Sequence, residues 1–114
     1  MVYSSLKNAK EFDNVFHSGK RFNSAIGQII IKLDPNKKRF GIVVGKKIGG
    51  AVVRNRIKRV IRSAFRILSD GISCVEVVFL PNSRCADTGF GHVLSEMKAA
   101  FGKAGISITG HSNP

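Results

Sequence analysis

The residues with the clearest chemical potential in this chain are cations gathered in one stretch. Residues 35–69 contain eleven lysines and arginines and no aspartate or glutamate. Arginine binds a phosphate through two parallel hydrogen bonds and lysine binds it as a point charge, so this stretch predicts a phosphate-binding surface. The residues singled out for that surface, with one amide among them, are Lys46, Lys47, Arg54, Asn55, Arg56, Lys58, Arg59, Arg62 and Arg66.

Other reactive residue types do not form a recognisable catalytic or metal-binding set. The seven carboxylates are spread along the chain, and the three histidines lack metal-ligand spacing. The two cysteines do not form a Cys-x-x-Cys pair. The glycine-bearing stretch 46–54 lacks the lysine and hydroxyl of a phosphate-binding loop. We therefore predict no catalytic residue and no metal site in the protein itself.

The charge balance indicates the class of partner. Nineteen basic and seven acidic residues give the 114-residue chain a formal net charge of +12. We expect a nucleic acid, with an anionic membrane and an acidic protein as alternatives. A cationic face kept only for solubility is a weaker explanation, because mixed charges serve solubility equally well.

The sequence also indicates in which cellular compartment the protein works. The amino terminus has no apolar stretch suited to a secretory signal, and the longest apolar run, 29–31, is far too short to span a bilayer. Two cysteines in a chain with a good core are typical of reduced thiols. We expect a cytoplasmic protein without a membrane span.

Periodicity predicts the elements that position the cations, within a single domain covering 1–114. A frayed tail is expected over 106–114. The other predicted segments are a helix near 6–18, strands at 25–33 and 38–46 joined as a hairpin by a turn at 34–36, a helix at 51–68, a strand at 75–80, a loop at 82–89 and a helix from 93 to 104. The order α-β-β-α-β-α indicates a small α+β sandwich with helices packed on one sheet.

The helix at 51–68 separates apolar residues from cations. Arg56 lies on the far margin of the apolar stripe, near Ile67. The cations that fill the face adjoining the stripe are Arg54, Lys58, Arg59, Arg62 and Arg66. Asn55 either holds a neighbouring arginine in place or is an ordinary polar residue of the first turn. The stripe consists of Val53, Ile57, Val60, Ile61, Ala64 and Leu68.

Two aromatic residues are candidates for contact with bases. Phe12 and Phe16 lie one turn apart on the first predicted helix. They are either core residues or a platform on which unpaired bases stack. Sequence alone does not place them beside the basic helix.

The basic stretch resembles a known family signature. Residues 46–66 match K-K-x-G-x-A-V-x-R-N-R-x-K-R-x-x-R followed by a helical phenylalanine, which is the signature of the bacterial ribonuclease P protein component. The resemblance extends over roughly 6–104. It implies a two-layer α-β-β-α-β-α sandwich with a left-handed βαβ crossover. It also implies binding to ribonuclease P RNA, the catalytic subunit that removes the 5′ leader of precursor tRNA with Mg2+ held mainly by RNA and substrate.

The resemblance also assigns roles to residues. The nine candidates listed above become contacts to the catalytic RNA. Ile30 stands where the family often has an aromatic residue, and the third strand lacks the basic residue that often ends it, so Arg84 is a candidate replacement. The residues implied for a cleft that grips the leader are Phe12, Phe16, Ile30, Lys58 and Arg62.

Three other functions remain alternatives at this point. A ribosomal-type or chaperone-type RNA-binding protein would carry a similar charge without any part in cleavage. A DNA-binding protein would read bases from the helix at 51–68. A membrane-surface helix fits less well, because the apolar stripe is narrow enough to be core. The sequence gives no indication of the oligomeric state.

Overall fold

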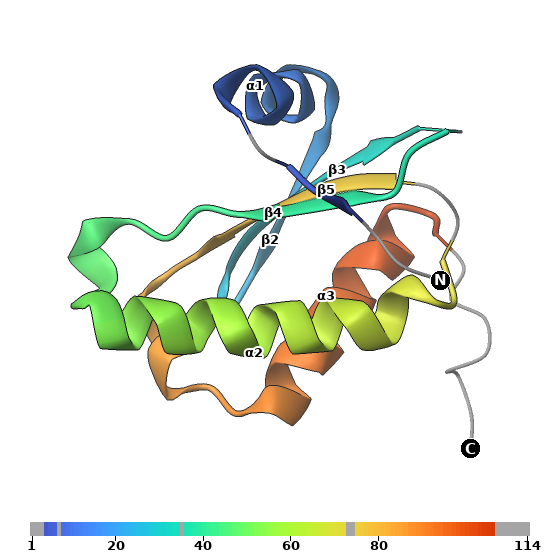
Figure 1. Cartoon of the computed structure of the whole chain (residues 1–114). Coiled ribbons are helices and arrows are strands. Elements are labelled where there is room, and N and C mark those ends of the chain that lie inside the picture. Colours follow the sequence, from blue (N-terminus) through green and yellow to red (C-terminus); the bar gives the residue numbers. More distant parts are fainter. Residues whose placement is uncertain (1–3, 7, 35, 73–74, 107–114) are drawn as a thin grey trace.

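The computed structural model describes residues 4–6, 8–34, 36–72 and 75–106 (Figure 1). Its elements, in chain order, are β1 (Ser4–Ser5), α1 (Ala9–Ser18), β2 (Lys20–Ser24), β3 (Gly27–Leu33), β4 (Arg39–Ile42), the 3-10 helix η1 (Lys46–Ile48), α2 (Ala51–Ser69), β5 (Val75–Pro81), the 3-10 helix η2 (Ser83–Asp87) and α3 (Phe90–Lys103).

One mixed sheet organises these elements. Its strand order is β1-β4-β5-β3-β2, with β4 parallel and β3 antiparallel to the central β5. The chain passes from β4 through α2 to the adjacent parallel β5, which confirms the expected βαβ crossover. Figure 1 shows α2 and α3 below the sheet and α1 above it. The predicted α+β sandwich is confirmed, and α1 adds a partial layer on the second face.

The alternation of β3 explains why helices cover both faces. Ile29 and Ile31 belong to the larger core, which α2 and α3 complete. Ile30, between them, belongs to a smaller core beneath α1. Successive strand residues point to opposite faces, so three consecutive isoleucines require apolar cover on both sides.

The amphipathic pattern of α2 is confirmed. Phe65, outside the predicted stripe, is also buried, and its ring stacks on Phe40 with centroids 4.1 Å apart. This packing fixes the rotation of α2, so its opposite face must point to solvent. The residues of the predicted stripe that are fully buried are Ile57, Ile61, Ala64 and Leu68, while Val53 and Val60 are partly buried.

The predicted hairpin between 25–33 and 38–46 is wrong. β5 lies between β3 and β4, and the hairpin that does form joins β2 to β3. The turn signal at 34–36 marks a reversal of the chain but does not determine which strand pairs with which. β2 and the two-residue β1 were not predicted, because each is short and polar.

Several boundaries also differ from the prediction. β4 ends at Ile42, four residues before 46, and α3 begins at Phe90 rather than 93. The expected loop at 82–89 contains η2. Ile106, placed in the expected tail, is buried in the larger core, while the rest of that tail, 107–114, lies outside the described residues.

Charged contacts and a close approach hold α1 on the sheet. Arg39 of β4 pairs with Glu11 of α1 at 2.6 Å and with Glu76 of β5 at 3.1 Å. Glu76 is only 3% exposed, and its negative charge would be costly to bury without the positive charge of Arg39 beside it.

A close approach also fixes α1 on the sheet. Gly41 leaves room for the Phe12 ring, since a Cβ there would lie 2.5 Å from Cε1 of that ring. Asn8 caps the amino terminus of α1, where its side chain accepts the Glu11 backbone N–H.

Candidate nucleic-acid interface

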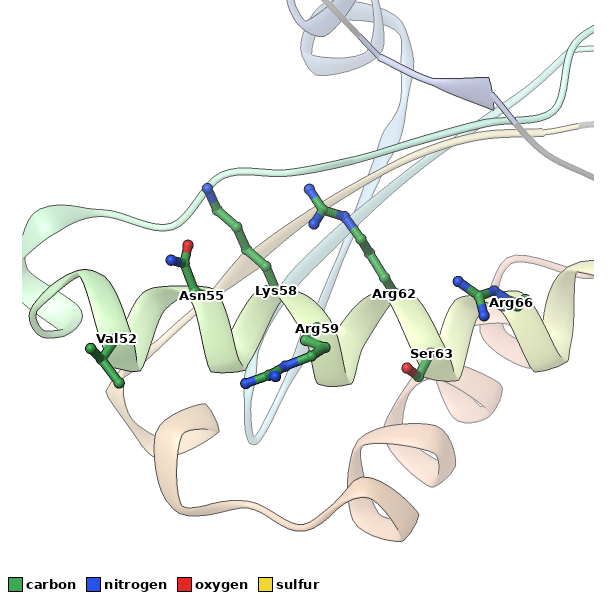
Figure 2. A pocket seen from close by; sticks show the side chains of 7 residues that line it. All are labelled: Val52, Asn55, Lys58, Arg59, Arg62, Ser63 and Arg66. Atoms are coloured by element: carbon green, nitrogen blue, oxygen red, sulfur yellow. The ribbon is translucent and has the colours of Figure 1, made fainter.

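The outward face of α2 carries an open groove with a cationic lining (Figure 2). The groove has a volume of about 550 Å³. None of its four cations has a carboxylate within ion-pair distance among the described residues. The described part of the chain therefore leaves these charges without a carboxylate partner, and they are available to an anionic ligand. The lining residues are Val52, Asn55, Lys58, Arg59, Arg62, Ser63 and Arg66.

The helical repeat explains this clustering. Positions three and four apart share one face of a helix, so Arg59, Arg62 and Arg66 follow one another along α2. In Figure 2, Lys58 and Arg62 extend towards the sheet, and Arg59 lies across the outer side of the helix. The surface is therefore broad enough to follow a phosphate backbone.

The start of α2 strengthens the positive potential. Its first turn contains no acidic residue, and Gly50 at its N-cap makes no side-chain capping hydrogen bond. The helix dipole adds a partial positive charge at this end. Lys46 and Lys47 of η1 are exposed just before the helix. Cations at a helix amino terminus destabilise the free protein, and a bound anion would relieve that repulsion.

Two arginines of the signature make contacts inside the protein. Arg54 donates from Nε to the Gly49 carbonyl oxygen at 3.1 Å. Arg56 donates from Nη2 to the Ala86 carbonyl oxygen of η2. Arg56 also lines a separate pocket of about 290 Å³ beside η2. These two side chains therefore brace the segments flanking α2 and lie outside the groove.

The residues predicted for a leader cleft fall into two groups. Phe12 and Phe16 lie on α1, with ring centroids 6.5 Å apart, and both are half-buried above the smaller core. Lys58 and Arg62 lie on α2, which packs against the other face of the sheet. Ile30 is 0% exposed beneath α1, so it offers no surface to a ligand in this structure.

Sequence reasoning missed three polar residues on the sheet beside Phe16. Arg21 and Asn23 of β2 and Gln28 of β3 share the sheet face that carries α1. Arg21 stands over the Phe16 ring, with its Cζ 5.8 Å from the centroid. The signal available in the sequence was the alternation of Lys20–Ser24 directly after Gly19, which is typical of a short strand.

The remaining reactive groups do not form a site among the described residues. Burial raises the pKa of the Cys85 thiol to about 11, so the thiol is neutral near pH 7.

Arg84, the candidate replacement for the basic residue at the end of the third predicted strand, is exposed on η2. Within the described ranges, no group of three or more His, Cys, Asp or Glu could hold a metal ion. No helix in that part of the chain is long and apolar enough to cross a membrane.

Comparison with known proteins identifies the family and agrees with the fold. The family model Ribonuclease P matches residues 2–105. The ribonuclease P protein component of Clostridium kluyveri is 34% identical over 109 residues, covering 92% of this chain and 96% of that protein. The Staphylococcus aureus RNase P protein has a TM-score of 0.79 at 22% identity, covering 90% of this chain and 96% of that one. The Thermotoga maritima protein has a TM-score of 0.76 at 24% identity, covering 88% and 96%. This chain therefore belongs to the ribonuclease P protein component family, whose members form part of an endoribonuclease complex.

Proposed function

We propose that this chain binds the catalytic RNA subunit of ribonuclease P through the groove on α2. The observation that carries this proposal is the row of cations in that groove that no carboxylate of the described ranges pairs with. A folded RNA presents rows of phosphates, and each neutralised phosphate releases counterions, which favours binding at low salt. Val52, 83% exposed in the same groove, adds an apolar contact that a sugar or a base can cover.

The α1 face of the sheet is the proposed contact for the 5′ leader of precursor tRNA. Phe16 is half-buried there, beside Arg21, which has no carboxylate partner among the described residues. Stacking on an aromatic ring tolerates any base, and a nearby cation tracks the backbone of a single strand. Because only the precursor has a leader, this contact would favour precursor over mature tRNA.

Mg2+ fits this proposal as a component of the RNA. We expect the RNA subunit and the substrate to hold most of these ions, because Mg2+ keeps several waters and readily binds phosphate oxygens. When bound there, Mg2+ supplies the electrostatic stabilisation for phosphodiester cleavage. The cations of α2 would reduce repulsion between RNA phosphates and so lower the Mg2+ concentration that assembly requires. We place this activity in the cytoplasm.

Reconstitution tests the proposal. The purified protein is mixed with a bacterial ribonuclease P RNA and precursor tRNA at low Mg2+, and 5′ cleavage is followed. We expect stimulated cleavage, and we expect Phe16→Ala to weaken binding of precursor more than binding of mature tRNA. An RNA-binding protein of the ribosomal or chaperone type would bind without stimulating cleavage. That outcome would overturn the proposal, and equal losses for both tRNAs would overturn the leader contact.

A further inference from the structure

Three polar side chains form a hydrogen-bonded row on the sheet beside Phe16. Arg21 donates from Nη1 to Gln28 Oε1 at 3.2 Å. Gln28 in turn donates from Nε2 to Asn23 Oδ1 at 3.0 Å. Arg21 and Asn23 are exposed and Gln28 is half-buried, so the row lies at the surface.

The chemistry of arginine fixes the direction of this row. A guanidinium has only donors, so the Gln28 atom that meets it must be the oxygen. The Gln28 amide nitrogen then faces Asn23, whose oxygen must accept. Gln28 therefore accepts one of the five N–H groups of the Arg21 guanidinium, and the remaining N–H groups are left for a ligand.

The strand register sets the row beside the aromatic ring. Arg21 pairs across the hairpin with Ile30, whose side chain lies beneath α1, so Arg21 also points to the α1 face. Its Cζ lies 5.8 Å from the Phe16 centroid. Among the described residues no carboxylate pairs with Arg21. An oriented, unneutralised guanidinium next to an aromatic ring suits one nucleotide of a single strand.

We propose that Arg21 is a phosphate contact for single-stranded RNA beside Phe16, and that Gln28 is the positioning residue that orients it. This proposal rests on the proposed leader contact and adds residues that the family signature does not include. The Arg21 guanidinium binds a backbone phosphate, while its plane and the Phe16 ring offer adjoining surfaces to a base. Asn23 completes the row by accepting from Gln28.

The strand provides a matched control. Lys20 carries the same charge one residue away, but it pairs with Ile31, whose side chain belongs to the larger core on the opposite face. Lys20→Ala therefore removes one charge from β2 without disturbing the row. The Arg21→Lys variant keeps the charge but lacks the planar fork that reaches Gln28 and a phosphate together.

The test uses the complex of RNA subunit and protein, with precursor and mature tRNA affinities measured over a salt series. We expect Arg21→Ala to weaken precursor binding about tenfold without changing mature tRNA binding. It should also lower the slope of log K against log salt by about 0.7, the value for one phosphate of a single strand. We expect Gln28→Ala to weaken precursor binding about threefold with the slope unchanged, because the charge remains. Arg21→Lys should retain the slope and recover part of the affinity.

Several results would overturn this inference. Equal losses for precursor and mature tRNA in Arg21→Ala would do so, as would an equal loss of precursor binding in Lys20→Ala. These results leave the proposed function intact if the wild-type complex still prefers precursor. A wild-type complex that shows no preference for precursor would overturn both. Thermal unfolding of each variant shows whether the row matters only for stability, in which case affinity measured on the folded variants would be unchanged and the inference wrong.

Discussion

Replacing Arg59 with alanine tests directly whether the α2 groove is the docking surface for RNA. The groove contains four cations, Lys58, Arg59, Arg62 and Arg66, and no described carboxylate pairs with them. If each neutralises one phosphate of structured RNA, together they contribute about 3.6 to the salt slope, at about 0.9 per phosphate. Arg59→Ala should lower that slope by about 0.9 and weaken binding by about 1.5 kcal/mol, roughly tenfold.

The measurement is the affinity of the protein for a labelled ribonuclease P RNA, without tRNA, over a series of salt concentrations. Lys10→Ala is the matched control, because Lys10 is an exposed cation on α1, on the other face of the sheet. Lys10→Ala lowers the net charge by the same amount as Arg59→Ala. Any difference in salt slope between the two variants is therefore due to the position of the charge and not to the total charge. Equal slopes for Arg59→Ala and Lys10→Ala would refute docking on α2.

Arg56→Ala separates bracing from binding within the signature. Because Arg56 donates to the Ala86 carbonyl oxygen, we expect this variant to lose about 1 kcal/mol of unfolding free energy. Its salt slope should change less than that of Arg59→Ala, since Arg56 lies outside the groove. If Arg56→Ala lowered the salt slope by about 0.9, the value for one phosphate, and left the free energy of unfolding unchanged, Arg56 would bind RNA instead.

Two further predictions concern packing and burial. Gly41→Ala would place a Cβ 2.5 Å from Cε1 of Phe12. The resulting overpacking should cost about 1–3 kcal/mol in urea unfolding and reduce the preference for precursor tRNA, whereas unchanged stability would contradict the packing of α1. The Cys85 thiol has its pKa raised by burial from 9.0 to about 11, so the folded state favours the neutral form. The free energy of unfolding is therefore fully present below about pH 9 and declines as the pH rises from about 9 to about 11, by up to about 3 kcal/mol. Urea titrations should show that Cys85→Ala lacks this alkaline decline, and an identical pH profile would count against the burial.

The central helix shows how much local pattern alone can predict. The stripe from Val53 to Leu68 was predicted from a repeat of 3.6 residues, and the structure buries four of its six members fully and the other two partly. The same repeat placed Arg54, Lys58, Arg59, Arg62 and Arg66 on one face and put Arg56 on the far margin. The groove contains four of these five cations, whereas Arg54 lies outside it. This much could be predicted because the positions of side chains around a helix depend mainly on their spacing in the sequence. The resemblance to the ribonuclease P protein family, drawn from the same stretch, is confirmed.

Strand pairing could not be predicted in the same way. The hairpin predicted between 25–33 and 38–46 is wrong, because β5, more than thirty residues later in the chain, lies between β3 and β4. A strand is recognised from alternation within a few residues, but its neighbour is chosen by contacts across the whole fold. The site is affected in the same way, because Arg21 meets Phe16 only when β2 pairs with β3.

The amino-acid sequence by itself indicated that a helix with a cationic face exists and to which family the chain belongs. Tertiary structure decided that Arg54 and Arg56 brace neighbouring segments, that Ile30 is sealed beneath α1, and that Arg21 stands beside Phe16. The physical reason is the distance along the chain between the residues that interact. Helical amphipathicity comes from neighbours along the chain, whereas burial and cross-strand contacts depend on residues that only folding brings together.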